Sequence, residues 1–497
     1  AGCDRNRIDD NGSFTRGAPV ASDKITPRRN CKSLVLPHLT AFLNPAGRMS
    51  MTDPTTTQST NAQTTDASRR TFLKSGTAAL AGGVAVSSLT ALSPSVYASG
   101  SDILKIGLVG AGGRGSGAAR EALRADEKTE LVAVADAFPD RAGNCLKNLK
   151  AIGSIEGRVK VSDDHIFGGL NGYKQVVEMV DVVLLATPPG FRPMQFRAAV
   201  DAGKHVFTEK PMATDPAGVQ SVFETVALSK EKNLAVLAGF CWRYDFQKKA
   251  LFERVLAGEI GDVRAVYGTY LTSPVKPMPA ASTRPEGMSD IEWMVRNWYN
   301  FTWLSGDGLV EQACHTCDWV AWAMGDRPAE SVTAVGGRQL AAEGGNIFDH
   351  IELNFVWDND ARGFLAQRQI PGCYNENLLT ILGTKGTAKI ESRGSTISDL
   401  KGNRTWKYEG PKPNMYQQEH DEFFASIRSG NYINDGDRMV NSTMMAIMGR
   451  MAGYTGKQVT WDMAMKSKLS LVPDVSKGWD SPVEFVPTAL PGVTKFV

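Results

Sequence analysis

The sequence predicts an α/β protein in which a doubly wound parallel sheet is followed by an α+β domain with a large, mostly antiparallel sheet. Three observations predict this fold. The apolar run Leu104–Val109 leads into a glycine-rich turn. From there to about residue 240, short strand-like runs alternate with helical patterns, as in a parallel sheet covered by helices. Beyond that point apolar residues recur at every second position over longer runs, which favours antiparallel strands.

Composition and charge limit the class of protein. A chain of 497 residues is too long for one hydrophobic core, so we expect about two or three domains. The 55 basic and 53 acidic residues leave a net charge of only +2, so we expect no nucleic acid or anionic membrane as a partner. The seven cysteines are scattered, and Cys314 and Cys317 lack a second ligand pair for zinc. We therefore predict no metal site.

Residues 1–67 are expected to be a disordered or mis-annotated leader. Met49 and Met51 offer later start positions for the chain that follows. The stretch 52–65 is rich in Thr and Gln, so it cannot bury enough apolar surface to fold.

Residues 68–98 resemble a twin-arginine export signal. The motif Ser-Arg-Arg-Thr-Phe-Leu-Lys at 68–74 precedes a Gly/Ala-rich apolar stretch, and Val-Tyr-Ala at 96–98 resembles a cleavage site. A membrane anchor is the alternative, but the apolar run is short and is interrupted by Gly82 and Gly83. We expect a periplasmic protein that is exported folded and has no permanent membrane span.

The turn after the first apolar run carries the residues of a dinucleotide-binding pattern: Gly110, Gly112, Gly113, Arg114 and Gly115. In such a pattern the first glycine allows a tight turn, the second lets a pyrophosphate approach the backbone, and the last lets the helix pack on the strand. A second apolar run ends in Asp136, where a carboxylate would accept from the adenosine ribose. This predicts a Rossmann domain that prefers NAD, with NADP as the alternative if Arg114 or Arg141 offsets the carboxylate. An ordinary strand-turn-helix corner is the other interpretation.

Strands of the Rossmann domain, 102–240, are expected at 104–109, 131–135, 158–162, 181–186, 204–208 and 234–238. Pro188 and Pro189 end the fourth strand where a cofactor crevice should open. The second domain is expected over 241–470, with period-two runs at 263–271, 347–357 and 363–370. Residues 416–454 return to helical spacing, and 471–497 form a C-terminal tail.

Two strand ends carry a family resemblance: Ala-Thr-Pro at 186–188 and Glu-Lys-Pro at 209–211. With the glycine turn, they resemble the family of glucose-fructose oxidoreductase, inositol dehydrogenase and the rhizopine-catabolism oxidoreductases over residues 102–465. The resemblance implies an NAD(P)-dependent oxidoreductase that acts on CH–OH groups of a sugar, cyclitol or related polyol with a tightly bound cofactor. It implies cofactor contacts for Thr187, Pro188, Glu209, Lys210 and Pro211, and it places Lys210 beside nicotinamide and substrate.

The chemistry of Lys210 supports the same role. An ammonium at the carboxyl end of a parallel strand lies at the mouth of the crevice, where it can donate to a reacting hydroxyl. A solvated surface lysine is the alternative, but the proline that follows restricts this lysine to extended backbone.

A second group of candidates lies in the predicted helix 308–324. Glu311, His315, Asp318 and Trp322 fall at i, i+4, i+7 and i+11, so they would share one helix face. His315 is the best general base, since its unperturbed pKa is near neutrality and the neighbouring carboxylates would hold its tautomer. The family has aspartate where this chain has Glu311, which we expect to tune His315. A satisfied core histidine is the alternative.

Substrate contacts are expected from three further places. The segment 241–244 resembles the family's substrate loop, which implies roles for Arg243 and Tyr244. Asp318 would orient the helix or meet substrate. Trp298 lies in an aromatic-rich stretch that suits a carbohydrate, although the same residues fit a core or an oligomer contact equally well. Arg192 replaces the family's usual histidine, which would favour an acidic or phosphorylated sugar.

Two rival functions stay open from sequence. One is a glycosidase or lyase that oxidises its substrate transiently, eliminates, and returns the same hydride. The other is a dinucleotide-binding sensor without chemistry. An exposed face of the second-domain sheet predicts a homodimer or homotetramer in either case.

Overall fold

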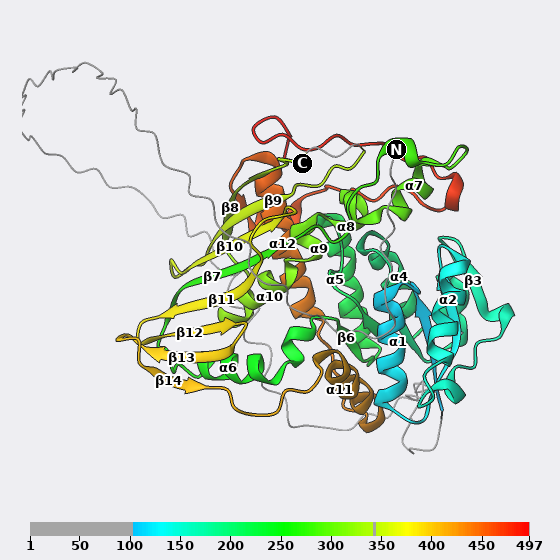
Figure 1. The fold of residues 1–497 in the computed structure, drawn as a ribbon, viewed down its shortest axis with the longest axis horizontal. Helices are drawn as coiled ribbons and strands as arrows, with labels where there is room; N and C mark the ends of the chain where they lie inside the picture. The colour runs from blue at the N-terminus through cyan, green and yellow to red at the C-terminus, as the bar shows by residue number, and fades with distance from the viewer. Residues whose placement is uncertain (1–102, 341–343, 497) are drawn as a thin grey trace, which may run out of the picture. The chain divides into compact units, whose positions relative to one another are not determined.

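The computed structural model describes residues 103–340 and 344–496 (Figure 1). The predicted leader, 1–67, and the predicted export signal, 68–98, lie outside the described residues. Two sheets carry the described chain, one of six strands and one of nine. The predicted fold class is confirmed.

The six-stranded sheet has the order β3-β2-β1-β4-β5-β6, and every pair in it is parallel. Its strands are β1 Leu104–Val109, β2 Thr129–Asp136, β3 Ile166–Gly168, β4 Val182–Leu185, β5 His205–Thr208 and β6 Val236–Ala238. The helices between them are α1 Gly113–Ala125, α2 Pro139–Lys150, α3 Tyr173–Met179, α4 Arg192–Asp201 and α5 Pro216–Glu231. β4 and β5 are buried along their whole length, because helices exclude water from both faces of such a sheet.

The strand predicted at 158–162 is wrong. A short 3-10 turn, Glu156–Arg158, ends where that segment begins, and the segment pairs with β2 only through a bridge between Leu131 and Val159. The third parallel strand is β3, further along the chain. Val159 and Val161 are buried, so their apolar pattern indicated core packing and not strand pairing.

The nine-stranded sheet has the order β14-β13-β12-β11-β7-β10-β9-β8-β15. Its strands are β7 Val263–Thr272, β8 Ser331–Gly337, β9 His350–Val356, β10 Arg362–Gln369, β11 Glu376–Gly383, β12 Gly386–Glu391, β13 Gly394–Asp399, β14 Arg404–Lys407 and β15 Val459–Thr460. All neighbours are antiparallel except β7 and β10, which are parallel. Buried and half-buried residues alternate along β10, because helices cover one face of the sheet and leave the other open.

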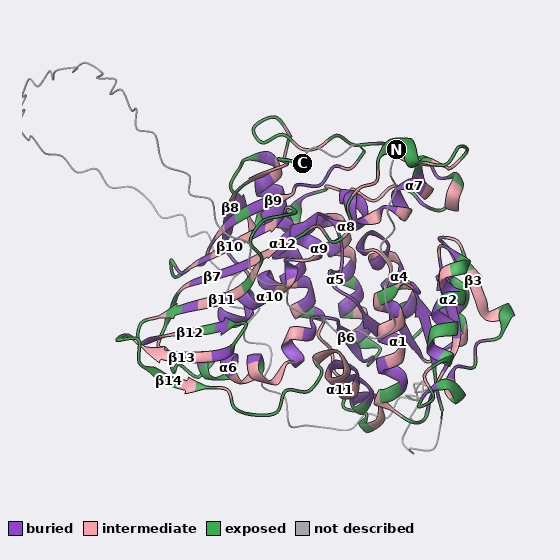
Figure 2. Ribbon diagram, in the orientation of Figure 1, coloured by how far each residue is buried: buried purple, intermediate pink, exposed green. Residues whose placement is uncertain are grey.

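The remaining helices are α6 Phe246–Leu256, α7 Asp290–Arg296, α8 Thr302–Ser305, α9 Gly308–Glu311, α10 Cys314–Ala323, α11 Met415–Ser429, α12 Gly436–Thr455 and α13 Trp461–Lys466. α12 is buried on nearly all sides and packs against β8, α10 and α5 (Figure 2). α11 packs against α1, and it adds Phe423, Phe424 and Ile427 to the core beneath β1. The C-terminal part of the chain therefore completes the Rossmann core.

No helix within 103–340 and 344–496 combines the length and the hydrophobicity that a bilayer crossing requires. The same residues contain no group of three or more His, Cys, Asp or Glu side chains placed to hold a metal ion.

Candidate active site

A pocket of about 450 Å³ opens at the carboxyl ends of β1, β2, β4 and β5. Tyr270, near the end of β7, and the α9–α10 segment close its other side. Ligands of open α/β sheets bind in this position, and the volume suits a small molecule. The predicted site residues that line the pocket are Gly110, Gly112, Gly113, Arg114, Gly115, Asp136, Thr187, Pro188, Glu209, Lys210, Trp298, Glu311 and His315.

The geometry of the glycine turn requires glycine at two of its positions, Gly110 and Gly115. Gly110 has φ +95°, a left-handed conformation that favours glycine. A Cβ on Gly115 would lie 1.8 Å from the Gly110 carbonyl oxygen, so only glycine lets α1 pack this closely. A Cβ on Gly112 or Gly113 would meet nothing within 4 Å. Because the N-cap Gly112 supplies no side-chain acceptor, the first N–H groups of α1 remain free for a phosphate.

Asp136 ends β2 beside this turn. Its Oδ2 accepts from the Ala111 N–H at 2.7 Å and its Oδ1 from the Phe138 N–H at 2.9 Å. Burial raises the pKa of the carboxyl, while the two backbone donors oppose that shift. A carboxylate oxygen can accept more than one hydrogen bond, so Asp136 can hold the turn and still accept from a ribose hydroxyl.

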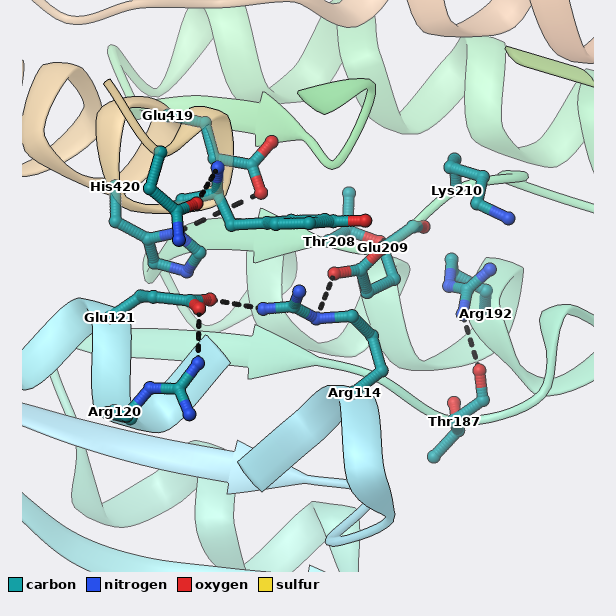
Figure 3. Close-up of polar contacts among 12 residues, drawn as sticks. Arg114, Arg120, Glu121, Thr187, Arg192, Thr208, Glu209, Lys210, Glu419 and His420 are labelled. Atoms are coloured by element: carbon teal, nitrogen blue, oxygen red, sulfur yellow. Dashed lines mark hydrogen bonds and ion pairs between the residues drawn. The ribbon is translucent and has the colours of Figure 1, made fainter. Parts of the chain in front are cut away.

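Arg114 is held by two carboxylates (Figure 3). It pairs with Glu121 and, at 3.0 Å, with Glu209, and its guanidinium lies 4.7 Å from the centre of the Tyr416 ring. Arg141 lines the pocket and has no carboxylate within ion-pair distance among the described residues. Of the two arginines expected to offset Asp136, only Arg141 is therefore free to meet a 2′-phosphate.

Lys210 and Glu311 form a buried ion pair with a nitrogen–oxygen distance of 3.1 Å. The ammonium also donates to the Glu311 backbone carbonyl. Gln312 donates to the second carboxylate oxygen, and the Tyr270 hydroxyl donates to Gln312 Oε1 at 2.6 Å. Burial by itself would lower the pKa of Lys210, but the Glu311 carboxylate outweighs it, so the pKa is raised. Lys210 is thus a cation and hydrogen-bond donor at neutral pH, and not a base.

His315 faces the same pocket from α10. Its ring stacks on Trp242 with centroids 4.6 Å apart. Its Nδ1 is buried and has no partner in the described chain, and Glu311 is engaged by Lys210. The predictions that carboxylates hold the His315 tautomer and that Glu311 tunes it are therefore wrong. Burial, with the nearby lysine charges, lowers the pKa of His315 well below its ordinary value, so the imidazole is neutral and can accept a proton.

The helix predicted over 308–324 is broken, and its polar residues do not share one face. α9 ends at Glu311 and α10 begins at Cys314, which changes the relative direction of the side chains on either side. His315 lines the pocket and Asp318 does not. The i+4 and i+7 spacings assumed a continuous helix, and the break removes that assumption.

Three residues predicted to bind substrate lie away from the pocket wall. Arg243 is buried and pairs with Asp318 at 2.8 Å and with Asp326 at 2.5 Å. The Tyr244 hydroxyl donates to Asp435 at 3.1 Å. These bonds tie the 241–244 segment to α10 and α12. Arg243, Tyr244 and Asp318 are therefore structural, because buried charges need partners inside the protein.

Arg192 braces the loops that follow β4 and β5. Its guanidinium donates to the carbonyls of Pro211 and Thr187, the second of which Figure 3 shows. Pro211 contributes that carbonyl and does not line the pocket. Burial lowers the pKa of Arg192 to about 10. Both terminal nitrogens of Arg192 already donate to carbonyls, so the guanidinium cannot bind the carboxylate or phosphate of an acidic sugar with two parallel hydrogen bonds. The prediction that Arg192 favours an acidic or phosphorylated sugar is therefore not supported.

Two family models match the chain in succession. Residues 104–240 match an oxidoreductase family with an NAD-binding Rossmann fold, and residues 249–389 match the GFO/IDH/MocA C-terminal domain. Together they span more than half of the chain. This protein belongs to the GFO/IDH/MocA oxidoreductase family. The predicted oxidoreductase class and the predicted NAD-binding domain are thereby confirmed.

Individual relatives agree with the family assignment. The chain is 25% identical over 352 residues to an inositol 2-dehydrogenase of Rhizobium meliloti, covering 67% of this chain and 92% of that protein. The WlbA dehydrogenase from Bordetella pertussis, solved with NADH and UDP-GlcNAcA, has a TM-score of 0.55 at 21% identity and covers 72% of this chain and 98% of its own. A levoglucosan dehydrogenase solved with NADH and levoglucosan has a TM-score of 0.55 at 18% identity over 72% of this chain and 99% of its own.

The groove of this GFO/IDH/MocA protein fits a nicotinamide dinucleotide. The open space at Gly112 and Gly113 and the free start of α1 suit a pyrophosphate, and Asp136 suits a ribose diol. Glu209 and Lys210 line the same groove, and Lys210 pairs there with Glu311 of α9. The cofactor-binding residues of the family pattern thus converge on one groove, except Pro211.

Replacing Asp136 with asparagine should weaken NADH binding about tenfold, because a charged acceptor for the ribose is lost. It should also narrow the preference for NADH over NADPH, because the charge that repels a 2′-phosphate is lost as well. Asparagine keeps the size of the side chain and one side-chain oxygen that can accept from a backbone N–H. Fluorescence titration with NADH and NADPH measures both affinities. An unchanged ratio of the two would show that Asp136 does not face the ribose.

Sequence reasoning missed Tyr270, Gln312 and Tyr416 as pocket residues. Tyr270 sits at an inward-facing position of an alternating strand, where a polar side chain is a usable signal. The sequence carries no such signal for Gln312, because this residue follows Glu311 and reaches the pocket only through the break after α9. Tyr416 is an aromatic residue in a helical pattern, which is typical of core packing.

Proposed function

We propose that this protein is a dehydrogenase that transfers hydride between an uncharged sugar, cyclitol or related polyol and a nicotinamide dinucleotide that it retains. One observation carries the proposal: a permanently charged Lys210 and a neutral His315 face the same pocket as the glycine turn. A donor and an acceptor at one hydroxyl are what alcohol oxidation requires.

The roles of the two residues follow from their protonation. When bound, the nicotinamide ring supplies the hydride acceptor. The Lys210 ammonium donates a hydrogen bond to the reacting hydroxyl oxygen and stabilises the negative charge that develops there. His315 takes the hydroxyl proton. Glu311 keeps Lys210 charged and oriented, and Gln312 and Tyr270 hold that carboxylate in place.

An uncharged substrate is favoured by how the cations of the pocket are used. Lys210 is balanced by Glu311, Arg114 by Glu209 and Glu121, and Arg192 donates to carbonyls. Arg141, the other cation that lines the pocket, lies 4.7 Å from the centre of the Phe138 ring and beside Asp136, where the ribose and not the substrate is expected. Trp298 lines the pocket and offers an apolar surface to the C–H groups of a ring. Inositol and levoglucosan, which the names of two similar proteins carry, are uncharged cyclic polyols as well, whereas the WlbA dehydrogenase was solved with the charged UDP-GlcNAcA.

The test is a substrate panel of myo-inositol, levoglucosan, free aldoses, a uronic acid and an aryl glycoside, each with NAD and with NADP. Formation of reduced nicotinamide with an uncharged polyol, and not with the uronate, supports the proposal. Release of the aryl group without net reduction would instead identify the redox-neutral glycosidase. Binding of NADH with no turnover on any member would favour the sensor.

The twin-arginine pattern at 68–74 supports a second part of the proposal, namely export to the periplasm with the cofactor already bound. The periplasm offers no regular supply of free dinucleotide, so the cofactor must travel inside the folded protein. Protein purified without added cofactor should carry nucleotide, which needs a dissociation constant below micromolar, or more than about 8 kcal/mol. Absorbance and the nucleotide released on denaturation measure it. Clean apoprotein with millimolar affinity would contradict this model.

We also propose a homodimer or homotetramer that forms through the open face of the nine-stranded sheet. Tyr267, Leu382 and Val335 are exposed large apolar residues on that sheet. The register across β11, β7, β10, β9 and β8 places them on one face. Light scattering should give two or four chains per particle, and Tyr267→Lys should dissociate them, since a charge on a buried contact is costly. A monomeric wild type would contradict it.

A further inference from the structure

A separate apolar cluster covers one end of the cofactor groove. It combines residues of the segment Ile291–Leu304, which includes α7 and α8, with residues of the C-terminal tail between Leu471 and Val483. We call these two stretches the roof. They pack against three side chains of the Rossmann domain, Phe138, Leu170 and Phe191, which do not belong to its central cores.

The three Rossmann side chains under the roof also line the groove. Phe138 follows Asp136 by two residues, and its N–H donates to the Asp136 carboxylate at 2.9 Å. Val295 and Trp298 of the roof line the groove as well. The roof is therefore part of the groove wall at the end where Asp136 lies.

Phe138 is held in place from outside its own domain. Trp479 of the tail stacks on its ring with centroids 5.4 Å apart and an interplanar angle of 22°. The Arg296 guanidinium, from α7, lies 4.0 Å from the centre of the same ring. Moving Phe138 away from the groove thus requires breaking contacts with both parts of the roof.

The tail is tied down on both sides of Trp479. Before it, the Leu471 N–H donates to Asp215 at 2.6 Å, at the start of α5. After it, the Val486 carbonyl accepts from Asn346 at 3.1 Å in the second domain. Figure 1 shows this C-terminal segment, in red, running beside α7. The tail therefore spans both halves of the described chain across the top of the groove.

We propose that the roof retains the dinucleotide, with Trp479 and Arg296 acting as positioning residues through Phe138. The proposal rests on the proposed function in that the groove holds a nicotinamide dinucleotide. An open groove lets a ligand lift away directly, whereas here one wall must first separate from a packed cluster. Because local opening of a packed cluster is slow and rare, it limits the rate of release.

The experiment measures the dissociation rate of NADH from the full chain by stopped-flow fluorescence, with excess NAD as the displacing ligand. Trp479→Ala should release NADH at least about tenfold faster than wild type, because interface mutations act mainly on dissociation. Trp479→Phe keeps an aromatic ring and should restore slow release. Val493→Ala is the matched control, since this residue of the tail is 73% exposed and does not belong to the roof cluster, and it should leave the rate unchanged.

A variant that misfolds does not end the test. The Arg296 side chain is 40% exposed, so Arg296→Gln removes its guanidinium from the Phe138 ring without opening a core, and release should be faster here too. Wild-type release rates in Arg296→Gln and in folded Trp479→Ala would overturn the roof proposal and leave the proposed function intact. Wild-type protein that binds no NADH at all would overturn the proposed function and this proposal together.

Discussion

Replacing Lys210 with alanine should lower turnover by about a hundredfold or more on any substrate that the panel identifies, while NADH still binds. The variant removes the ammonium that Glu311 holds in the pocket, and no other lysine among the described residues lines that pocket. Lys210 pairs with Glu311 and not with the glycine turn or Asp136, so the dinucleotide keeps the contacts that those residues make. Steady-state kinetics beside a fluorescence titration with NADH separates the two effects.

A matched double variant controls for a stranded charge. Lys210→Ala leaves Glu311 buried without its partner, which can cost roughly 3–5 kcal/mol in stability. Lys210→Met combined with Glu311→Gln removes both charges and keeps similar volumes. It should fold better than Lys210→Ala and be equally inactive, because the missing ammonium and not the stranded carboxylate limits the reaction. Near-normal turnover in either variant would refute the role of Lys210.

Replacing His315 with asparagine should lower the rate of oxidation by about two to four orders of magnitude, the usual scale for a lost proton acceptor. Asparagine stays polar but cannot take a proton near neutral pH. His165 offers the matched control, since it is half-buried, bonds to the Val132 carbonyl and does not line the pocket. His165→Asn should therefore leave the rate unchanged.

The pH profile gives the second readout for His315. Burial lowers its pKa, so the neutral, active form persists below the ordinary histidine value. The oxidation rate should stay level as pH falls through the ordinary histidine range and should decline only below it. The reverse reduction should rise where oxidation declines, because it needs the protonated ring. Both limbs should vanish in His315→Asn. An acid limb that survives the substitution would assign the proton to another group.

The parts of the site that sequence predicted correctly are those that local backbone geometry decides. Gly110 needs a positive φ, and Gly115 lies against the Gly110 carbonyl, so both requirements fall within six residues of chain. Asp136 follows the next strand in a fixed pattern. The one wrong strand, at 158–162, failed because apolar spacing reports burial and does not distinguish a paired segment from an unpaired one.

The sequence by itself determined the fold class, the dinucleotide-binding turn and the place of Lys210 just after a parallel strand, because each depends on residues close together in the chain. Tertiary structure alone decided what Glu311 does. α9 and α10 are separated by two residues, and Glu311 at the end of α9 pairs with Lys210, 101 positions earlier, and not with His315. The tertiary structure also pairs Arg243 with Asp318 outside the pocket and stacks Trp479 on Phe138. Such contacts depend on how separate elements pack in space, which spacing along one element cannot report.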